Sequence, residues 1–270
     1  EMLQIILFAI ILGIAITITG TKAEAFRKGI CSLNDIMMSM VSIIMKFAPI
    51  GVFFLIAKTF ATQGIDMIIP LLSYFLTVAL VLLLHVFITY TAFLKFVGNV
   101  SPITFLKKMR TAIVFAFSTA SSNATIPVTL STVEKRLGVD KSVASFTVPL
   151  GATINMDGTA IMQGVATVFI ATVYMIDLTV VDYLTVILTA TLASIGTAGV
   201  PGVGLIMLTM VLTQVGLPVE GVALIIGIDR LLDMMRTAVN IIGDSMVSIV
   251  TSKSENSFNL SVFNDTKAGL

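Results

Sequence analysis

The chain has 270 residues, of which 57% are hydrophobic and only 11% are charged. Because soluble domains carry about 25% charged residues, this composition excludes an ordinary soluble fold and indicates a helical membrane protein. The formal net charge of +1 gives no sign of an acidic partner such as nucleic acid. A single cysteine, Cys31, and a single histidine, His85, exclude an internal disulfide and the usual zinc clusters.

Two long apolar runs occupy the first hundred residues, at 3–19 and 68–94, the second interrupted only by His85. A run of about 20 apolar residues predicts a membrane span. We interpret His85 as a packed or interfacial residue rather than a proton relay. The chain begins at Glu1, close to the first span and without an initiating methionine, so we expect it to be truncated at its N-terminus.

Lysine and arginine cluster in four regions and predict the orientation in the membrane. The connections at 62–67, 176–181 and 214–220 contain neither residue. Since basic connections stay in the cytoplasm, we expect a multi-pass protein of the cell (inner) membrane with a cytoplasmic C-terminus. The clustered basic residues are Lys22, Arg27 and Lys28, then Lys95, Lys107, Lys108 and Arg110, then Lys135, Arg136 and Lys141, and finally Lys253 and Lys267.

Two segments, about 101–138 and 182–216, each begin and end on one predicted side of the membrane. Each is interrupted near its middle, by Ser-Ser-Asn-Ala-Thr-Ile-Pro at 121–127 and by Gly-Thr-Ala-Gly-Val-Pro-Gly at 196–202. Small and hydroxyl residues before a proline suit a sharp helical turn, and paired interruptions are typical of inverted-repeat transporters. We therefore predict two oppositely oriented re-entrant helical hairpins. The alternative is pairs of loosely packed spans with a glycine-rich kink.

Between the hairpins, an otherwise apolar span at 142–175 contains Gly-Ala-Thr-Ile-Asn-Met-Asp-Gly-Thr at 151–159. Asn, Asp and Gly in succession favour an unwound turn that breaks the helix. Inward carbonyl oxygens together with the carboxylate of Asp157 would suit a small cation such as sodium. A simple kink with a buried, hydrogen-bonded Asp157 is the alternative.

The last predicted helix, 222–252, carries polar residues where a membrane helix should be apolar. Asp233, Arg236, Thr237, Asn240 and Asp244 are spaced by three, four and seven residues, so they share one helix face. A charge facing lipid would cost at least about 3 kcal/mol, so this face should point inward and carry function. An internal salt-bridge network, pairing Arg236 with Asp233 or with Asp229, is the alternative. The tail that follows, 253–270, is polar, and we predict it to be disordered and cytoplasmic.

Four motifs together resemble the sodium/dicarboxylate symporter family, which includes the excitatory amino acid transporters and archaeal aspartate transporters. They are the tip at 121–127, Asn-Met-Asp-Gly-Thr at 155–159, the tip at 194–202, and Asp-Met-Met-Arg-Thr-Ala-Val-Asn at 233–240 followed by Gly243 and Asp244. The resemblance implies an all-α elevator-type transporter that assembles as a homotrimer. Residues 1–66 would be part of the scaffold and trimerisation helices, and 67–252 would form the transport domain.

The resemblance also implies site residues. Asp233 would bind the amino group of the substrate and Arg236 its side-chain carboxylate. The full substrate set would be Ser121, Ser122, Thr159, Val200, Gly204, Asp233, Arg236, Thr237 and Asn240. One sodium ion would lie among Gly151, Asn155, Asn240 and Asp244, a second near Thr153, Ser194, Ile195 and Thr197, and a third at Asp157.

The sequence departs from the family pattern in two respects. About three further helices precede the position of Glu1 in the family, and one of them contributes to the third sodium site. An arginine that members place at the position of Ala120 or Met234 is missing, although Arg230 lies one turn earlier.

Together these features predict a secondary symporter that takes up aspartate or glutamate with sodium as coupling ion, without another cofactor. A proton-coupled glutamate/aspartate symporter and a C4-dicarboxylate symporter are the alternatives. A fixed carboxylate at Asp233 would repel a dicarboxylate that lacks an amine, and Arg236 disfavours a neutral amino acid. An aspartyl protease using Asp157 and Asp244, or a passive channel, fits less well, and we predict that the protein is not an enzyme.

Overall fold

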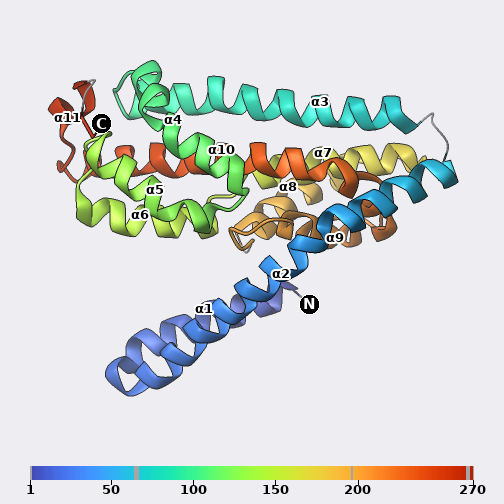
Figure 1. The fold of residues 1–270 in the computed structure, drawn as a ribbon, viewed down its shortest axis with the longest axis horizontal. Coiled ribbons are helices and arrows are strands. Elements are labelled where there is room, and N and C mark those ends of the chain that lie inside the picture. Colours follow the sequence, from blue (N-terminus) through green and yellow to red (C-terminus); the bar gives the residue numbers. More distant parts are fainter. Residues whose placement is uncertain (1, 64–66, 196, 266–267, 270) are drawn as a thin grey trace. The chain divides into compact units, whose positions relative to one another are not determined.

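The computed structural model describes residues 2–63, 67–195, 197–265 and 268–269. The chain divides into two compact units, Glu1–Lys58 and Thr59–Leu270. The described residues form helices and connections, with no strand among them (Figure 1). Gly196 and Lys267, both named above, lie outside the described residues, as does part of the predicted connection at 62–67.

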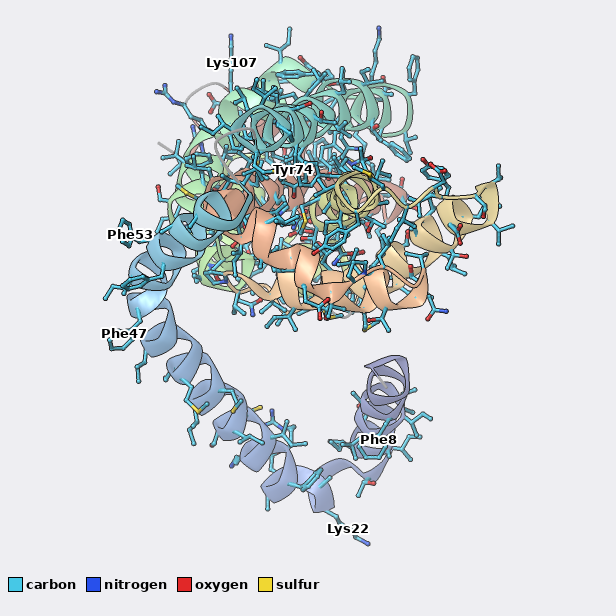
Figure 2. All side chains as sticks on the ribbon, turned by 90° about the vertical axis from the view of Figure 1, so that its right-hand side faces the viewer. Phe8, Lys22, Phe47, Phe53, Tyr74 and Lys107 are labelled. Carbon is cyan, nitrogen blue, oxygen red and sulfur yellow. The ribbon has the colours of Figure 1, made fainter. Side chains whose placement is uncertain are left out.

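The first unit consists of α1 (Met2–Thr19), the short 3-10 helix η1 (Gly20–Ala23) and most of α2 (Glu24–Gln63). Among the side chains described in this unit, most of the large apolar ones are exposed. Phe8 is 65% exposed and Phe47 is equally exposed (Figure 2). Long helices with exposed apolar side chains are typical of segments that face lipid or another protein.

The second unit begins with α3 (Ile68–Leu84), which continues into two π-helical segments, η3 (His85–Tyr90) and η4 (Phe93–Val97). The stretch Ile68–Val97 is one of two in the described residues that are long and apolar enough to cross a membrane, and Lys141–Val173 is the other. A π turn inserts one extra residue per turn and is frequent at functional sites.

The first predicted hairpin forms two packed helices, α4 (Pro102–Thr119) and α5 (Ser122–Lys135). The chain reverses at Ala120, whose φ of 51° is left-handed, and Ser121 caps α5 by accepting a hydrogen bond from Ala124 N at 3.2 Å. Pro127 lies inside α5 and not at the turn. The small residues before this proline therefore form the reversal.

The predicted broken helix consists of α6 (Lys141–Ile154) and α7 (Asp157–Val173), separated by Asn155 and Met156. The second hairpin consists of α8 (Val180–Ile195) and α9 (Val203–Gln214). Its tip ends at Gly202, where φ is 81°.

A short 3-10 helix, η5 (Val219–Gly221), leads into the last long helix, α10 (Val222–Ser254). It runs through the middle of the second unit, in contact with α3, α4, α5, α6, α7 and α9 (Figure 1). Its residues from Arg236 to Met246 are all buried. The polar face predicted from the sequence is therefore inside the protein.

The tail is ordered where it is described, so the prediction of disorder is wrong. Helix α11 (Leu260–Asn264) docks Phe263, which is 1% exposed, beside the base of the first hairpin. The ammonium of Lys108 donates to the carbonyl of Val262 at 2.7 Å, and Asn259 N donates to Gly138 O at 2.7 Å. Composition alone predicted disorder, but a buried aromatic ring and the satisfied carbonyls hold this segment in place.

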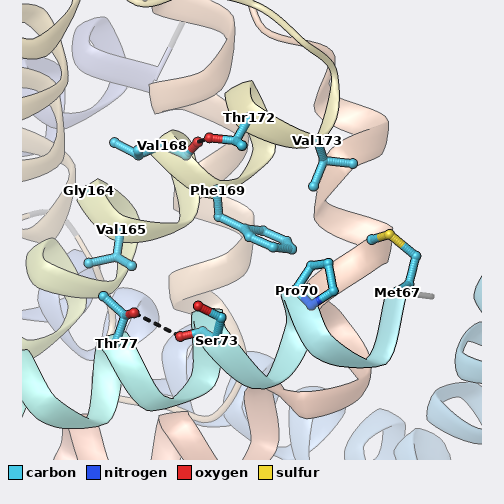
Figure 3. A pocket seen from close by; sticks show the side chains of 10 residues that line it. All are labelled: Met67, Pro70, Ser73, Thr77, Gly164, Val165, Val168, Phe169, Thr172 and Val173. Carbon is cyan, nitrogen blue, oxygen red and sulfur yellow. Dashed lines mark hydrogen bonds between the residues drawn. The ribbon is translucent and has the colours of Figure 1, made fainter. Parts of the chain in front are cut away.

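An apolar groove of about 680 Å³ opens between α3 and α7 (Figure 3). The hydroxyl of Thr77 donates to Ser73 O at 2.8 Å inside α3, which leaves the wall of the groove apolar. Phe169 extends from α7 towards α3, where its ring stacks on that of Tyr74 with centroids 5.0 Å apart.

Candidate functional site

The tips of the two hairpins meet at one place. The hydroxyl of Ser121 donates to Gly199 O at 2.7 Å, and Asn123 N donates to the same carbonyl at 3.1 Å. A Cβ on Gly199 would lie 2.8 Å from Ala152 O, so only glycine allows this approach. Three segments that are far apart in the sequence therefore converge beside the break in the helix at 155–156.

A small polar cavity of about 10 Å³ lies under the tips. This is roughly the space that one water molecule needs, so the site is closed. Its wall includes most of the predicted substrate residues, namely Ser122, Thr159, Val200, Gly204, Asp233, Thr237 and Asn240. Ala120, Met156, Thr197, Ala198 and Gly199 complete it. Of the remaining predicted residues, Ser121 joins the tips and Arg236 lies beside the wall, in contact with Asp233.

Arg236 is 1% exposed and pairs with two carboxylates of its own helix. Its Nη1 and Nη2 donate to the two oxygens of Asp229 at 2.9 and 3.2 Å, and Nη2 also donates to Asp233 Oδ1 at 2.8 Å. The internal ion network weighed above therefore exists, and it lies at the wall of the cavity. Asp229, 3% exposed, was not among the predicted site residues, although its spacing of seven from Arg236 could have indicated it.

Asp233 also reaches the second hairpin. Its Oδ2 accepts a hydrogen bond from the backbone N–H of Gly202 at 3.0 Å. One carboxylate oxygen thus faces Arg236 and the other holds the tip. The closed tip occupies a position at which an ammonium group would compete for the same carboxylate.

Asn240 connects the cavity to the interrupted helix. Its side-chain oxygen accepts from Gly158 N at 2.8 Å, and its Nδ2 lies 3.3 Å from the sulfur of Met156. Its backbone carbonyl lies 3.4 Å from Nδ2 of Asn155. A single residue therefore joins the cavity wall to the group of oxygens around the break.

That group contains the four residues predicted for the first sodium ion. Asp244 is 2% exposed, and Asn155 Nδ2 donates to its Oδ1 at 2.9 Å. A Cβ on Gly151 would collide with the same carboxylate. A buried carboxylate beside the carbonyl of Asn240 is the hard oxygen donor set that a small cation prefers, so the residues present fit sodium.

Asp157, predicted for a third sodium ion, contacts two residues of the π-helical segment. Its Oδ2 lies 2.8 Å from His85 Nε2 and also accepts a hydrogen bond from the hydroxyl of Tyr90. Neither residue was predicted to contact this carboxylate, and the interpretation of His85 as only packed or interfacial is incomplete. A lone histidine in an apolar helix was the one available signal.

The residues predicted for the second sodium ion are less complete as a site. Thr153 is exposed and its hydroxyl donates to Leu150 O at 2.8 Å. Ser194 and Thr197 are buried and donate to carbonyls of their own segment, while Ile195 is 42% exposed. With all three hydroxyls engaged locally, a cation here would depend on backbone carbonyls.

Neither Ala120 nor Arg230 supplies the arginine that is missing from the family pattern. Ala120 lies at the reversal of the first hairpin and lines the cavity without supplying charge. Arg230 is exposed, so it does not replace the missing arginine in the site. Among the described residues, Arg236 is the cation that contacts Asp233 at the cavity wall.

Comparison with known proteins decides the family. The model of the Sodium:dicarboxylate symporter family matches residues 1–254. The chain belongs to this family. It is therefore part of a membrane protein, and the family comprises transporters rather than enzymes.

Similar proteins include bacterial and animal transporters. The chain is 38% identical over 259 residues to the Proton/sodium-glutamate symport protein of Bacillus caldotenax, an alignment covering 96% of this chain and 61% of that protein. It is 40% identical over 246 residues to Excitatory amino acid transporter 1 of Rattus norvegicus, covering 90% and 45%. The chain thus spans about half the length of the curated relatives it matches.

Proposed function

We propose that the protein is a secondary symporter that takes up aspartate or glutamate. One observation carries the proposal: a fully buried guanidinium, Arg236, lies beside a second charge of opposite sign, Asp233, at the wall of a closed polar cavity. A substrate with a carboxylate and an ammonium group at separate ends would match both charges. The names of the relatives, glutamate symport protein and excitatory amino acid transporter, agree with this substrate class.

Each charged residue then has a role in binding. Arginine binds carboxylate with two parallel hydrogen bonds and stays charged when buried, so Arg236 would select the side-chain carboxylate. Asp233 would bind the amine. Ser122, Thr159, Thr237 and Asn240 would hold the remaining polar atoms, with the backbone at Val200 and Gly204 closing the wall.

Sodium is the coupling ion in this proposal, in keeping with the family. Asp244, Asn155, Gly151 and Asn240 would hold one ion. When bound, sodium supplies the positive charge that a cluster of buried carboxylates needs in low dielectric. Asn240 lines the cavity, and its backbone carbonyl lies beside Asn155, among the oxygens that would bind the ion. Substrate and sodium would then raise each other's affinity by the same factor.

The closed cavity requires a moving part. At about 10 Å³ it has no room for an amino acid, so one of the tips has to open for the substrate. In the proposed mechanism, re-entrant hairpins of the transport domain, 67–252, enclose the substrate and the domain then moves like an elevator. Residues 1–66 would belong to the scaffold of a homotrimer in the cell (inner) membrane, with the tail 253–270 in the cytoplasm.

Uptake of labelled aspartate and glutamate by the complete protein in liposomes tests the proposal. We expect accumulation when sodium is higher outside than inside, and none when choline replaces sodium. Accumulation of succinate but neither amino acid would overturn the proposed substrate class.

A proton-coupled symporter is a second candidate, favoured by one observation. His85 lies 2.8 Å from Asp157 near the ion group, and the relative from Bacillus caldotenax is named for both protons and sodium. A proton gradient applied to the same liposomes without sodium distinguishes the two. Uptake under that condition would establish proton coupling in place of sodium coupling.

A further inference from the structure

Tyr74 lies in α3 within the second unit (Figure 2), and only 2% of it is exposed. Its hydroxyl has no hydrogen-bond partner among the described residues. A buried hydroxyl without a partner is unfavourable, especially in surroundings that contain little water. A hydrogen-bond acceptor that came within reach of this hydroxyl in another state of the protein would therefore be stabilising.

The ring of Tyr74 is held firmly while its hydroxyl is not. The ring stacks on Phe169 at 5.0 Å between centroids, with an angle of 34° between the planes. Phe169 in turn extends from α7 along the wall of the groove between α3 and α7 (Figure 3). Helix α3 contacts α10, the helix of Asp229 and Arg236, and the charges of both residues act on the hydroxyl without a hydrogen bond to either.

Asp229 depends on Arg236 in this closed structure. Both of its oxygens accept hydrogen bonds from the guanidinium, at 2.9 and 3.2 Å, and it is 3% exposed. The Nη atoms that hold Asp229 and Asp233 are the atoms that would bind a substrate carboxylate. Arg236 Nε also has no partner among the described residues, so the guanidinium has a donor in reserve. If the guanidinium turned away, both oxygens of Asp229 would need another donor.

We propose that Tyr74 is a positioning residue whose hydroxyl donates to Asp229 when Arg236 turns from its aspartates to the substrate carboxylate. The inference rests on the proposed transport of acidic amino acids and adds the residue that makes the exchange of partners feasible. Tyr74 acts through Asp229 and does not touch the substrate. Its hydroxyl is idle in the closed, empty cavity and engaged when the cavity is filled.

The alternative is that Tyr74 only packs, its hydroxyl carrying no function. Tyr74→Phe separates the two, because it removes one oxygen and keeps the ring on Phe169. If the tyrosine only packs, loss of an unpaired hydroxyl leaves the substrate affinity unchanged and does not lower the stability. If the hydroxyl is used only with substrate bound, the variant loses affinity and keeps its stability without substrate.

The test measures the aspartate Kd and the melting temperature without substrate for the complete protein, Tyr74→Phe and a control. Tyr183→Phe is the matched control, because Tyr183 lies on α8 and is 45% exposed. We expect Tyr74→Phe to raise the Kd about tenfold or more, as for loss of a hydrogen bond to a charged group, with no fall in melting temperature. The control should change neither quantity.

A double-mutant cycle measures whether the effect of Tyr74 on affinity depends on Asp229. In an Asp229→Asn background, Tyr74→Phe should cost much less affinity than in the wild type, because the partner charge is gone. An unchanged Kd in Tyr74→Phe, or a loss of affinity that is the same in both backgrounds, overturns the inference alone. A wild-type protein that binds neither aspartate nor glutamate overturns the proposed function, and this inference with it.

Discussion

The backbone N–H of Gly202 donates a hydrogen bond to Oδ2 of Asp233 at 3.0 Å. The second hairpin tip is thereby attached to the carboxylate that would bind the amine of a substrate. Because the other oxygen of Asp233 already faces Arg236, an incoming ammonium group has to displace the tip or share the carboxylate with it. Opening of the tip and recognition of the amine are linked through one side chain.

Gly202→Val should weaken the closed tip. Gly202 has a φ of 81°, a left-handed conformation that costs a residue with a side chain about 1–2 kcal/mol. We expect faster dissociation of bound aspartate, measured by stopped-flow exchange. Gly164→Ala is the control, since a Cβ at Gly164 would meet open space. Equal dissociation rates in both variants would contradict the role of the tip.

Asp233→Asn tests the amine partner. Asparagine keeps an oxygen for Gly202 N but loses the charge that attracts an ammonium group. We expect aspartate to bind more weakly, while succinate is affected less. Competition of labelled aspartate uptake by succinate measures this in both proteins. If the ratio of the two affinities does not move, Asp233 is not the amine partner.

Arg236→Ala should abolish selectivity for acidic substrates. Removing it also leaves Asp229 and Asp233 buried without a cation, a loss of about 3–5 kcal/mol in such pairs. We expect aspartate binding to fall strongly, with room left for serine, alanine or cysteine. Isothermal titration with these ligands, after a check by circular dichroism that the variant is folded, makes the measurement. Unchanged aspartate affinity in a folded variant would rule out this role.

Asp244→Asn should flatten the sodium dependence of substrate binding. The substitution keeps the approximate shape of the side chain but removes the buried charge that sodium would neutralise. The measurement is the aspartate Kd as choline replaces sodium step by step. Asp182→Asn is the control, because Asp182 is only half-buried and its carboxylate accepts from Thr179 at the start of α8. A dependence as steep as in the wild type would exclude Asp244 from the coupling site.

Phe263→Ala should release the tail from the first hairpin. Truncation of a buried phenylalanine costs about 3–5 kcal/mol, more than the few contacts of a five-residue helix can replace. We expect faster hydrogen exchange in residues 255–265 and unchanged exchange in α10. Leu260→Ala, at a position 50% exposed, serves as the control. Equal exchange in both variants would show that Phe263 does not hold the tail.

Much of the local structure could be predicted from the sequence because it depends on short-range pattern. Spacings of three, four and seven placed the polar residues from Asp233 to Asp244 on one helix face, and that face is buried. Asn155 and Met156 interrupt a helix because Asn, Asp and Gly compete with helical hydrogen bonding. Composition was a poorer guide for the tail, where one aromatic residue, Phe263, outweighs a polar surrounding.

The sequence by itself thus determined an all-helical membrane protein, the residue types of the candidate site and the family. Only the tertiary structure decided which of these residues are partners. Arg236 pairs with both Asp229 and Asp233, and Asp157 meets His85, 72 residues earlier in the chain. Periodicity specifies the face on which a side chain lies but not what packs against that face. In an interior with little water, polar groups are satisfied by whichever partner the packing of helices brings within reach.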